Sequence, residues 1–254
     1  MWKKLRITLL LLVLATVALN TWRGQQQARD WTHTIQIAIF PINGDGSPAT
    51  ARLIASLREE DFKDIEAFLD EQAHAHGIDN PRPALVSLQP ALRESPPPQP
   101  PRHNALDTII WSLKLRYWAW RQPDGVPRAH IRAFVIFRDS DATGGHVPDS
   151  HGLSKGQIAI SNVHVARNMQ YTNRVVIAHE ILHTMGATDK YGANLQPIFP
   201  EGYAEPEASQ RYPQRFCEIM AGRTPISAHE AAMPESLAEC VIGVQTAREI
   251  GMLR

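Results

Sequence analysis

The stretch VVIAHEILHTMGATD, residues 175–189, decides how this chain is expected to fold. It is apolar before and between its polar positions, which is typical of a helix buried in a core. His179 and His183 are four residues apart, so a helix places both imidazoles on one face, within reach of one metal ion. Gly186 follows three residues later, where a helix can end in the left-handed conformation. The stretch therefore predicts a buried helix that ends in a turn.

Beyond that turn, the chain can bring Asp189 back toward the two histidines as a third ligand. Three protein ligands leave a fourth position for water, which is the arrangement of a catalytic zinc ion. Glu180 follows the first histidine and suits a general base acting on that water. A surface helix with solvated histidines is the plainer reading, but buried His and Glu side chains need partners. The sequence thus predicts zinc bound by His179, His183 and Asp189, with Glu180 as the catalytic base.

Two sets of residues after the helix leave alternatives open. A downstream glutamate could replace Asp189 as third ligand, although a proline-rich loop is a poor place for one; the candidates are Glu201, Glu205 and Glu207. A tyrosine could donate a hydrogen bond to an oxyanion, and the candidates are Tyr191, Tyr203 and Tyr212.

The pattern HExxHxxGxxD from His179 to Asp189 resembles the zinc signature of the metzincin clan of metallopeptidases. That clan has HExxHxxGxx followed by His or Asp, and later a methionine turn beneath the metal. The aspartate is similar to the snapalysin-type minority of the clan. Met220, in the run CEIMAG at 217–222, is the candidate for the methionine turn. The similarity at the level of motifs covers about residues 171–222.

This resemblance implies a fold and an activity. The implied fold is an α+β zinc-peptidase domain with a mixed twisted sheet, an active-site helix, a methionine turn and a C-terminal helix. The implied activity is hydrolysis of a peptide or protein substrate by a zinc-activated water, with Glu180 as general base. The resemblance also implies that the strand before the zinc helix, at 157–165, borders the cleft and pairs with extended peptide. The alternative is a zinc-stabilised binding or assembly protein without proteolytic activity.

The N-terminus reads as a targeting segment. Lys3, Lys4 and Arg6 precede an apolar run at 7–19, which is the layout of an export signal. The run is shorter than the ~20 residues of a typical membrane span. Residues 1–28 are therefore predicted to be a signal peptide or an uncleaved signal anchor, with a polar spacer at 20–30 and membrane association through 7–19. The basic residues favour export of everything that follows, to the periplasm or the extracellular space.

The charge composition argues against nucleic acid as a binding partner. The 254 residues include 26 basic and 26 acidic side chains, so no strong global field would attract nucleic acid.

Cys217 and Cys240 are the two cysteines. In an exported protein they are expected to form a disulfide, the alternative being two free buried thiols.

The zinc-peptidase domain is predicted to span 29–254, and hydrophobic periodicity places its elements. The expected helices are 50–76, ending at Gly77; a tryptophan-rich helix from Asn104 or Asp107 to Trp120; the zinc helix 172–185; and a last helix from Pro234 through Met252. The expected strands are 34–40, 84–88, 130–137 and 157–165. A stiff proline-rich loop is predicted at 95–101 and a long loop at 188–215.

Overall fold

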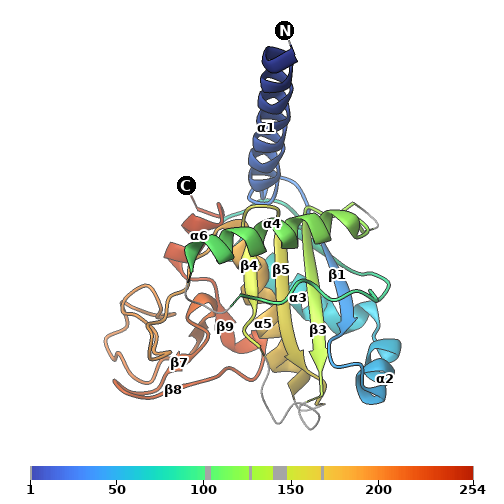
Figure 1. Ribbon diagram of the computed structural model, residues 1–254. Coiled ribbons are helices and arrows are strands. Elements are labelled where there is room, and N and C mark those ends of the chain that lie inside the picture. Colours follow the sequence, from blue (N-terminus) through green and yellow to red (C-terminus); the bar gives the residue numbers. More distant parts are fainter. Residues whose placement is uncertain (1, 101–103, 126–127, 140–147, 167–168, 254) are drawn as a thin grey trace.

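The chain forms a mixed five-stranded sheet with helices on both faces, in a computed structural model that describes residues 2–100, 104–125, 128–139, 148–166 and 169–253. The strand order is β2-β1-β3-β5-β4, and only β4 runs antiparallel to its neighbour (Figure 1). The strands are β1 (Ile35–Asn43), β2 (Ala84–Leu88), β3 (Ile131–Arg138), β4 (His151–Leu153) and β5 (Ile158–His164). The predicted α+β class is confirmed, and so are the four predicted strands.

Helices cover the two faces of the sheet unequally. Among the described helices, only α4 (Ala105–Arg121) packs against one face, through the buried side chains of Leu115 and Ala119. The other face packs against α3 (Lys63–Ala75) and α5 (Gln170–Met185), which lie behind the sheet in Figure 1. Because both faces are covered, the central strands are apolar on both sides rather than alternating.

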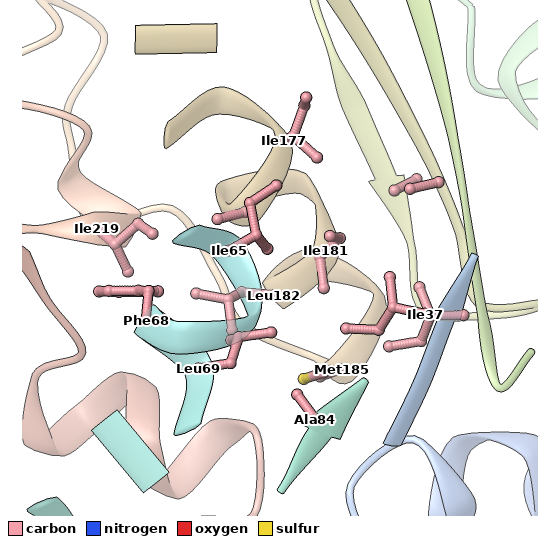
Figure 2. Close-up of a cluster of buried hydrophobic side chains, with 14 of the residues drawn as sticks. Ile37, Ile65, Phe68, Leu69, Ala84, Ile177, Ile181, Leu182, Met185 and Ile219 are labelled. Atoms are coloured by element: carbon pink, nitrogen blue, oxygen red, sulfur yellow. The ribbon is translucent and has the colours of Figure 1, made fainter. Parts of the chain in front are cut away.

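The zinc-motif helix α5 is part of the larger core. Ile181 and Leu182 are fully buried between α3 and the sheet (Figure 2). Full burial of such a side chain contributes roughly 1.5–3 kcal/mol to stability, so this contact fixes the rotation of the helix. The helix ends at Gly186, whose φ of 108° is left-handed, as predicted. The histidines lie on the less completely buried face of the helix.

The predicted helix at 50–76 is wrong in one respect, because it is broken in the middle. The segment forms α2 (Pro48–Ser56), a 3-10 turn η1 (Glu59–Phe62) and then α3. Leu57 and Arg58 between them have extended backbone. The Arg58 N–H donates to the Asp61 carboxylate at 2.8 Å, which starts a new helical turn instead of continuing the old one.

The predicted last helix, from Pro234 through Met252, is present only at Val244–Glu249, so the prediction is wrong for the residues before Val244. The C-terminal segment forms a 3-10 turn η4 (Leu237–Glu239), a two-residue strand β9 (Cys240–Val241) and a short helix α6 (Val244–Glu249). β9 pairs in parallel with β6 (Cys217–Glu218), so strand pairing replaces helix at these positions. Most of 188–215 is irregular, as expected, and β7 (Thr224–Pro225) and β8 (Ala231–Ala232) form a further small pair.

The N-terminal segment is a single helix, α1 (Trp2–Gln27), which is long and apolar enough to cross a membrane. The polar spacer predicted at 20–30 is helical as far as Gln27. The chain then enters the core directly: Ala28 is fully buried, and the Trp31 Nε1–H donates to the Ile250 carbonyl at 2.9 Å. α1 extends away from the rest of the molecule (Figure 1).

Candidate metal centre

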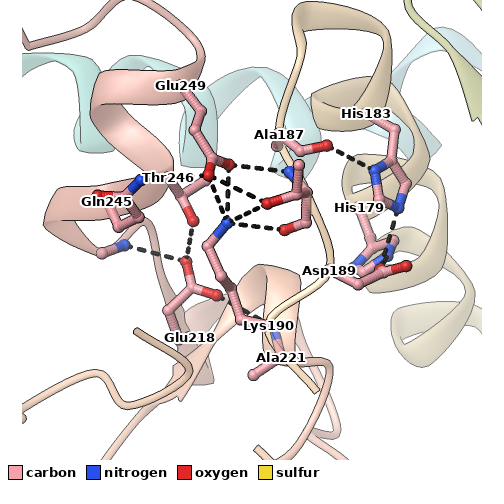
Figure 3. Close-up of polar contacts among 12 residues, drawn as sticks. His179, His183, Ala187, Asp189, Lys190, Glu218, Ala221, Gln245, Thr246 and Glu249 are labelled. Atoms are coloured by element: carbon pink, nitrogen blue, oxygen red, sulfur yellow. Dashed lines mark hydrogen bonds and ion pairs between the residues drawn. The ribbon is translucent and has the colours of Figure 1, made fainter. Parts of the chain in front are cut away.

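The imidazoles of His179 and His183 converge with the carboxylate of Asp189 at the end of α5 (Figure 3). Asp189 Oδ1 lies 3.2 Å from the Nε2 atom of each histidine. Ligand atoms around a tetrahedral zinc ion are about 3.3 Å apart, given zinc–ligand bonds of about 2.0–2.2 Å. Both histidine–aspartate separations therefore match the spacing of ligand atoms in such a site, and all three sequence-predicted ligands are brought together.

The tautomers of the two histidines follow from the hydrogen bonds of their Nδ1 atoms. The Nδ1 atom of His179 lies 2.9 Å from the Ile219 carbonyl, and that of His183 lies 2.8 Å from the Ala187 carbonyl. A carbonyl only accepts hydrogen bonds, so each Nδ1 carries the proton and donates. With its proton on Nδ1, a neutral imidazole presents the Nε2 lone pair to a metal ion, and a protonated one donates from Nε2 to Asp189. The two Nε2 atoms and the Asp189 carboxylate could therefore hold a cation, with the outer hydrogen bonds that orient metal-binding histidines.

Glu180 lies beside this cluster, and its carboxylate is within 4.8 Å of the histidine nitrogens. The side chain is buried, and its Oε2 atom has no hydrogen-bond partner among the described residues. Burial raises the pKa of Glu180 to about 7. A buried carboxylate without a hydrogen-bond partner, next to these three converging side chains, has the position expected of a general base that accepts a proton from water.

Asp189 reaches the histidines because a polar network braces the loop that carries it. The buried ammonium group of Lys190 lies 2.7 and 2.8 Å from the two carboxylate oxygens of Glu249, on α6 (Figure 3). The same carboxylate accepts from the backbone N–H and hydroxyl of Thr188. The residues on both sides of Asp189 are thus tied to the C-terminal helix. Sequence reasoning missed Lys190 and Glu249, because nothing local indicates that residues 59 apart form a pair.

The charge state of Asp189 is consistent with a ligand. Partial burial raises the pKa of its carboxyl group, but hydrogen bonds to His179 and His183 outweigh burial and bring the pKa below its ordinary value. The group is therefore ionised over the whole physiological range, as a metal-binding carboxylate must be.

The segment around Met220 is a tight turn, as expected, and it lies against the site. The turn is the 3-10 helix η3 (Ile219–Ala221), closed by Gly222 with a φ of 67°. Met220 is fully buried, its carbonyl accepts from the Lys190 N–H, and the neighbouring Ile219 carbonyl is the acceptor for His179. The turn therefore supports both a histidine and the aspartate-bearing loop. Its equivalence to a methionine turn stays a prediction.

A buried carboxylate holds that turn in shape. Glu218 Oε2 accepts from the Ala221 N–H at 3.0 Å, and Oε1 accepts from the Thr246 hydroxyl at 2.7 Å and the Gly243 N–H at 3.2 Å. Burial raises the pKa of Glu218 despite these hydrogen bonds. The turn and α6 are thereby joined through one side chain.

A cavity of about 700 Å³ opens over the converging ligands. Tyr191 lines it, with its ring centroid 6.5 Å from that of His179. Tyr203 and Tyr212 do not line it; their hydroxyl groups lie 2.9 Å from each other, and burial raises the pKa of Tyr203 to about 12. The alternative glutamate ligands are also outside the lining and exposed, namely Glu201, Glu205 and Glu207.

The strand beside the cavity is not the one expected. β5 pairs with β3 on one side and β4 on the other, so it is interior, and the edge strand next to α5 is β4. Gly152 on β4 lies so close to α5 that a Cβ atom there would be 2.3 Å from the Cβ of His183. His151 joins the cavity lining with it, a role that no sequence signal indicated because a three-residue strand has no readable periodicity.

The two cysteines are side by side but are free thiols rather than the expected disulfide. Both are buried, on paired strands β6 and β9. Each Sγ instead donates to a backbone carbonyl, Cys217 to Glu218 at 3.2 Å and Cys240 to Ser236 at 3.6 Å.

No model of a known protein family matches the chain, and no curated protein matches it in sequence. The metzincin resemblance accordingly rests on the residues of the motif, and on them the function is proposed.

Proposed function

We propose that this chain is an exported zinc metallopeptidase that hydrolyses peptide bonds. The observation that carries the proposal is the convergence of His179 Nε2, His183 Nε2 and Asp189 Oδ1, with both Nδ1 atoms committed to carbonyls and the Glu180 carboxylate unpartnered beside them. A site that only stabilised the fold would have no use for a buried base.

The residues of the site divide the chemistry among them. Zinc, when bound there, would lower the pKa of a water molecule toward neutrality and polarise the substrate carbonyl. Glu180 would accept the proton of the attacking water and later deliver it to the leaving amine. Tyr191 is the one tyrosine of the three candidates that borders the cavity, so it is the candidate donor to the oxyanion. An extended peptide would lie along β4, the edge strand beside α5.

Export is the second part of the proposal. α1 is apolar and carries Lys3, Lys4 and Arg6 at its start, which favours an N-terminus inside and a domain outside the membrane. The helix would serve as a signal segment or an anchor, and the domain would act in the periplasm or the extracellular space.

Metal content tests the site. The purified full chain is expected to contain about one zinc per molecule. Asp189→Ala should lose most of it, because two histidines alone bind zinc weakly, whereas Glu205→Ala should keep it because that carboxylate is exposed and outside the cavity. Elemental analysis for zinc, iron and cobalt on folded protein gives the answer. A folded chain that takes up no zinc, or that selects iron, would contradict the proposal.

Turnover tests the base. Glu180→Gln is expected to keep zinc and to lower the cleavage rate of a broad peptide library by about 10²–10⁴-fold. Glu205→Gln is the matched control and should cleave like the parent. Retained activity in Glu180→Gln would exclude the assigned role, and a zinc-loaded parent that cleaves nothing would favour the non-enzymatic alternative.

A further inference from the structure

Helix α4 exposes an apolar stripe that no part of the described chain covers. Its members recur every three or four residues, so they share one face of the helix. Their exposed fractions run from 41% to 73%, and they are Leu106, Ile109, Ile110, Leu113, Tyr117 and Trp120. The opposite face, with Leu115 and Ala119, is buried against the sheet. Trp120, at the end of the tryptophan-rich helix predicted from the sequence, is thus exposed.

This concentration of exposed apolar side chains is unusual. Beyond α1, thirteen large apolar residues are exposed in the described part of the chain, and six of them are on α4. Contiguous apolar patches of this kind mark interaction surfaces. The stripe combines aliphatic side chains with Tyr117 and Trp120, and aromatic residues of this type are enriched where a protein meets the membrane–water boundary.

The foot of α1 and α4 meet at the turn between β4 and β5. Gln25 of α1 donates to the Ser154 carbonyl at 3.4 Å, and the Gln157 side chain lies against Gly24. On the other side of the same turn, the Arg116 side chain of α4 is 3.4 Å from the Cβ position of Gly156. Figure 1 shows α1 rising from the edge of the molecule along which α4 runs crosswise.

This arrangement places α4 at the depth of lipid headgroups. Trp22, which is exposed near the end of the apolar part of α1, precedes the contact of Gly24 with the domain by two residues, or about 3 Å of helix. The headgroup layer on each side of a bilayer is roughly 5–8 Å thick. If α1 spans the membrane, α4 must therefore run within or against that layer.

Basic side chains surround the stripe at the same level. Lys114, Arg116 and Arg121 are on α4, and Arg23 is at the foot of α1. Basic residues beside an apolar helix face favour the surface of anionic lipids.

We propose that α4 is an interfacial helix that docks the domain onto an anionic phospholipid bilayer, next to the membrane-spanning α1. The inference rests on the export part of the proposed function and not on its chemistry. It has a consequence for the site: Trp111 of α4 contacts His151 of the cavity lining edge to face, with ring centroids 6.1 Å apart. Docking of α4 would therefore hold the cavity at a fixed height above the bilayer.

Environment-sensitive labels on the full chain test this proposal. Single cysteines are introduced at Leu113→Cys on the stripe, Leu10→Cys in α1 and Met233→Cys, which is about as exposed as the stripe but lies near β8. The native cysteines are buried, so a nitrobenzoxadiazole maleimide should label the introduced ones, with the unsubstituted chain as a check. The labelled chains are reconstituted in vesicles of two parts phosphatidylcholine to one part phosphatidylglycerol.

The label at residue 113 is expected to shift its emission to the blue and to be quenched by brominated lipid, as the label at residue 10 does, while the label at 233 stays aqueous. Changing Leu106, Tyr117 and Trp120 together to serine should abolish the shift at 113 and leave zinc content unchanged. An aqueous label at 113 would overturn the proposal. So would a shift that vanishes when vesicles hold one chain each, because a second copy would then be covering the stripe. The same shift in Asp189→Ala would show that docking stands even if the zinc assignment fails.

Discussion

The two histidines and the aspartate of the candidate site reach the same point by different means. His179 and His183 are on α5, whose backbone hydrogen bonds and buried residues fix their spacing. Asp189 is on an irregular segment whose position depends on Lys190, Glu249 and the turn at Met220. A side chain on a helix is thus placed by local geometry, whereas a side chain on a loop is placed by a few long-range polar contacts.

The largest effect is expected from breaking the Lys190–Glu249 ion pair, which holds the loop that carries Asp189. Glu249→Gln removes a charge from a buried pair and leaves the Lys190 ammonium group uncompensated. Loss of one partner of such a pair costs about 3–5 kcal/mol of unfolding free energy. Zinc affinity should also fall, by about 10–100-fold, because residues that position ligands have effects of this size. Chemical denaturation and zinc titration measure the two quantities.

The matched control is Glu59→Gln, which removes the same charge from an exposed pair with Lys63. That change should cost less than about 1 kcal/mol and leave zinc affinity alone. Replacing both partners, Lys190→Met with Glu249→Leu, should recover part of the stability. Equal losses in the two Glu→Gln variants would mean that the buried pair does not brace the loop.

The helix side of the comparison is tested next by Gly152→Ala. The added Cβ would lie 2.3 Å from the His183 Cβ and 2.5 Å from the Glu180 carbonyl oxygen, so β4 must move away from α5. Overpacking of this kind typically costs 1–3 kcal/mol, and peptide cleavage should suffer more than zinc binding because the histidines stay on their helix. Gly192→Ala, in the same cavity lining, meets only the Asn194 side chain at 3.1 Å and should be nearly neutral. Thermal unfolding and peptide cleavage are measured for both variants. Equal results for Gly152→Ala and Gly192→Ala would contradict the close packing of β4 on α5.

The smallest effect is expected at the turn, from Glu218→Gln. An amide cannot accept at both of its ends, so one of the hydrogen bonds from the Ala221 or Gly243 N–H is lost, at about 1 kcal/mol of unfolding free energy.

The unfolding free energy of the parent should also depend on pH through Glu218. Burial raises the pKa of Glu218 above its ordinary value of 4.5, so the folded state keeps the proton longer than the unfolded state does. The stability from this group is present below pH 4.5 and is lost as pH rises through the raised pKa.

Unfolding free energies measured from pH 4 upward should therefore fall less steeply in Glu218→Gln than in the parent. Glu201→Gln, an exposed glutamate outside the turn, should reproduce the slope of the parent. Identical slopes in all three proteins would show that Glu218 does not titrate as described.

Sequence alone predicted the parts of this protein that local geometry controls. Helical periodicity places residues four apart on one face, so the pairing of His179 and His183 and the end of their helix at Gly186 could be read directly. The strands β1, β3 and β5 were readable because each is a run of apolar residues covered on both faces, and β2 was readable as a shorter apolar run. The approach of Asp189 to the two histidines could be expected from its spacing after the glycine, but the contacts that place it could not.

Only the tertiary structure decided what depends on residues far apart in the chain. The order of the sheet makes β4 the edge strand beside the cavity, and a three-residue strand leaves no pattern to read. The pairing of β6 with β9 turned an expected helix into strand, and the pairing of Lys190 with Glu249 placed the loop of Asp189. The apolar periodicity of α4 predicted a helix but not which face is covered, because the sheet reaches only one side of it. Periodicity reports how a segment is wound, whereas burial and pairing depend on what the rest of the chain brings against it.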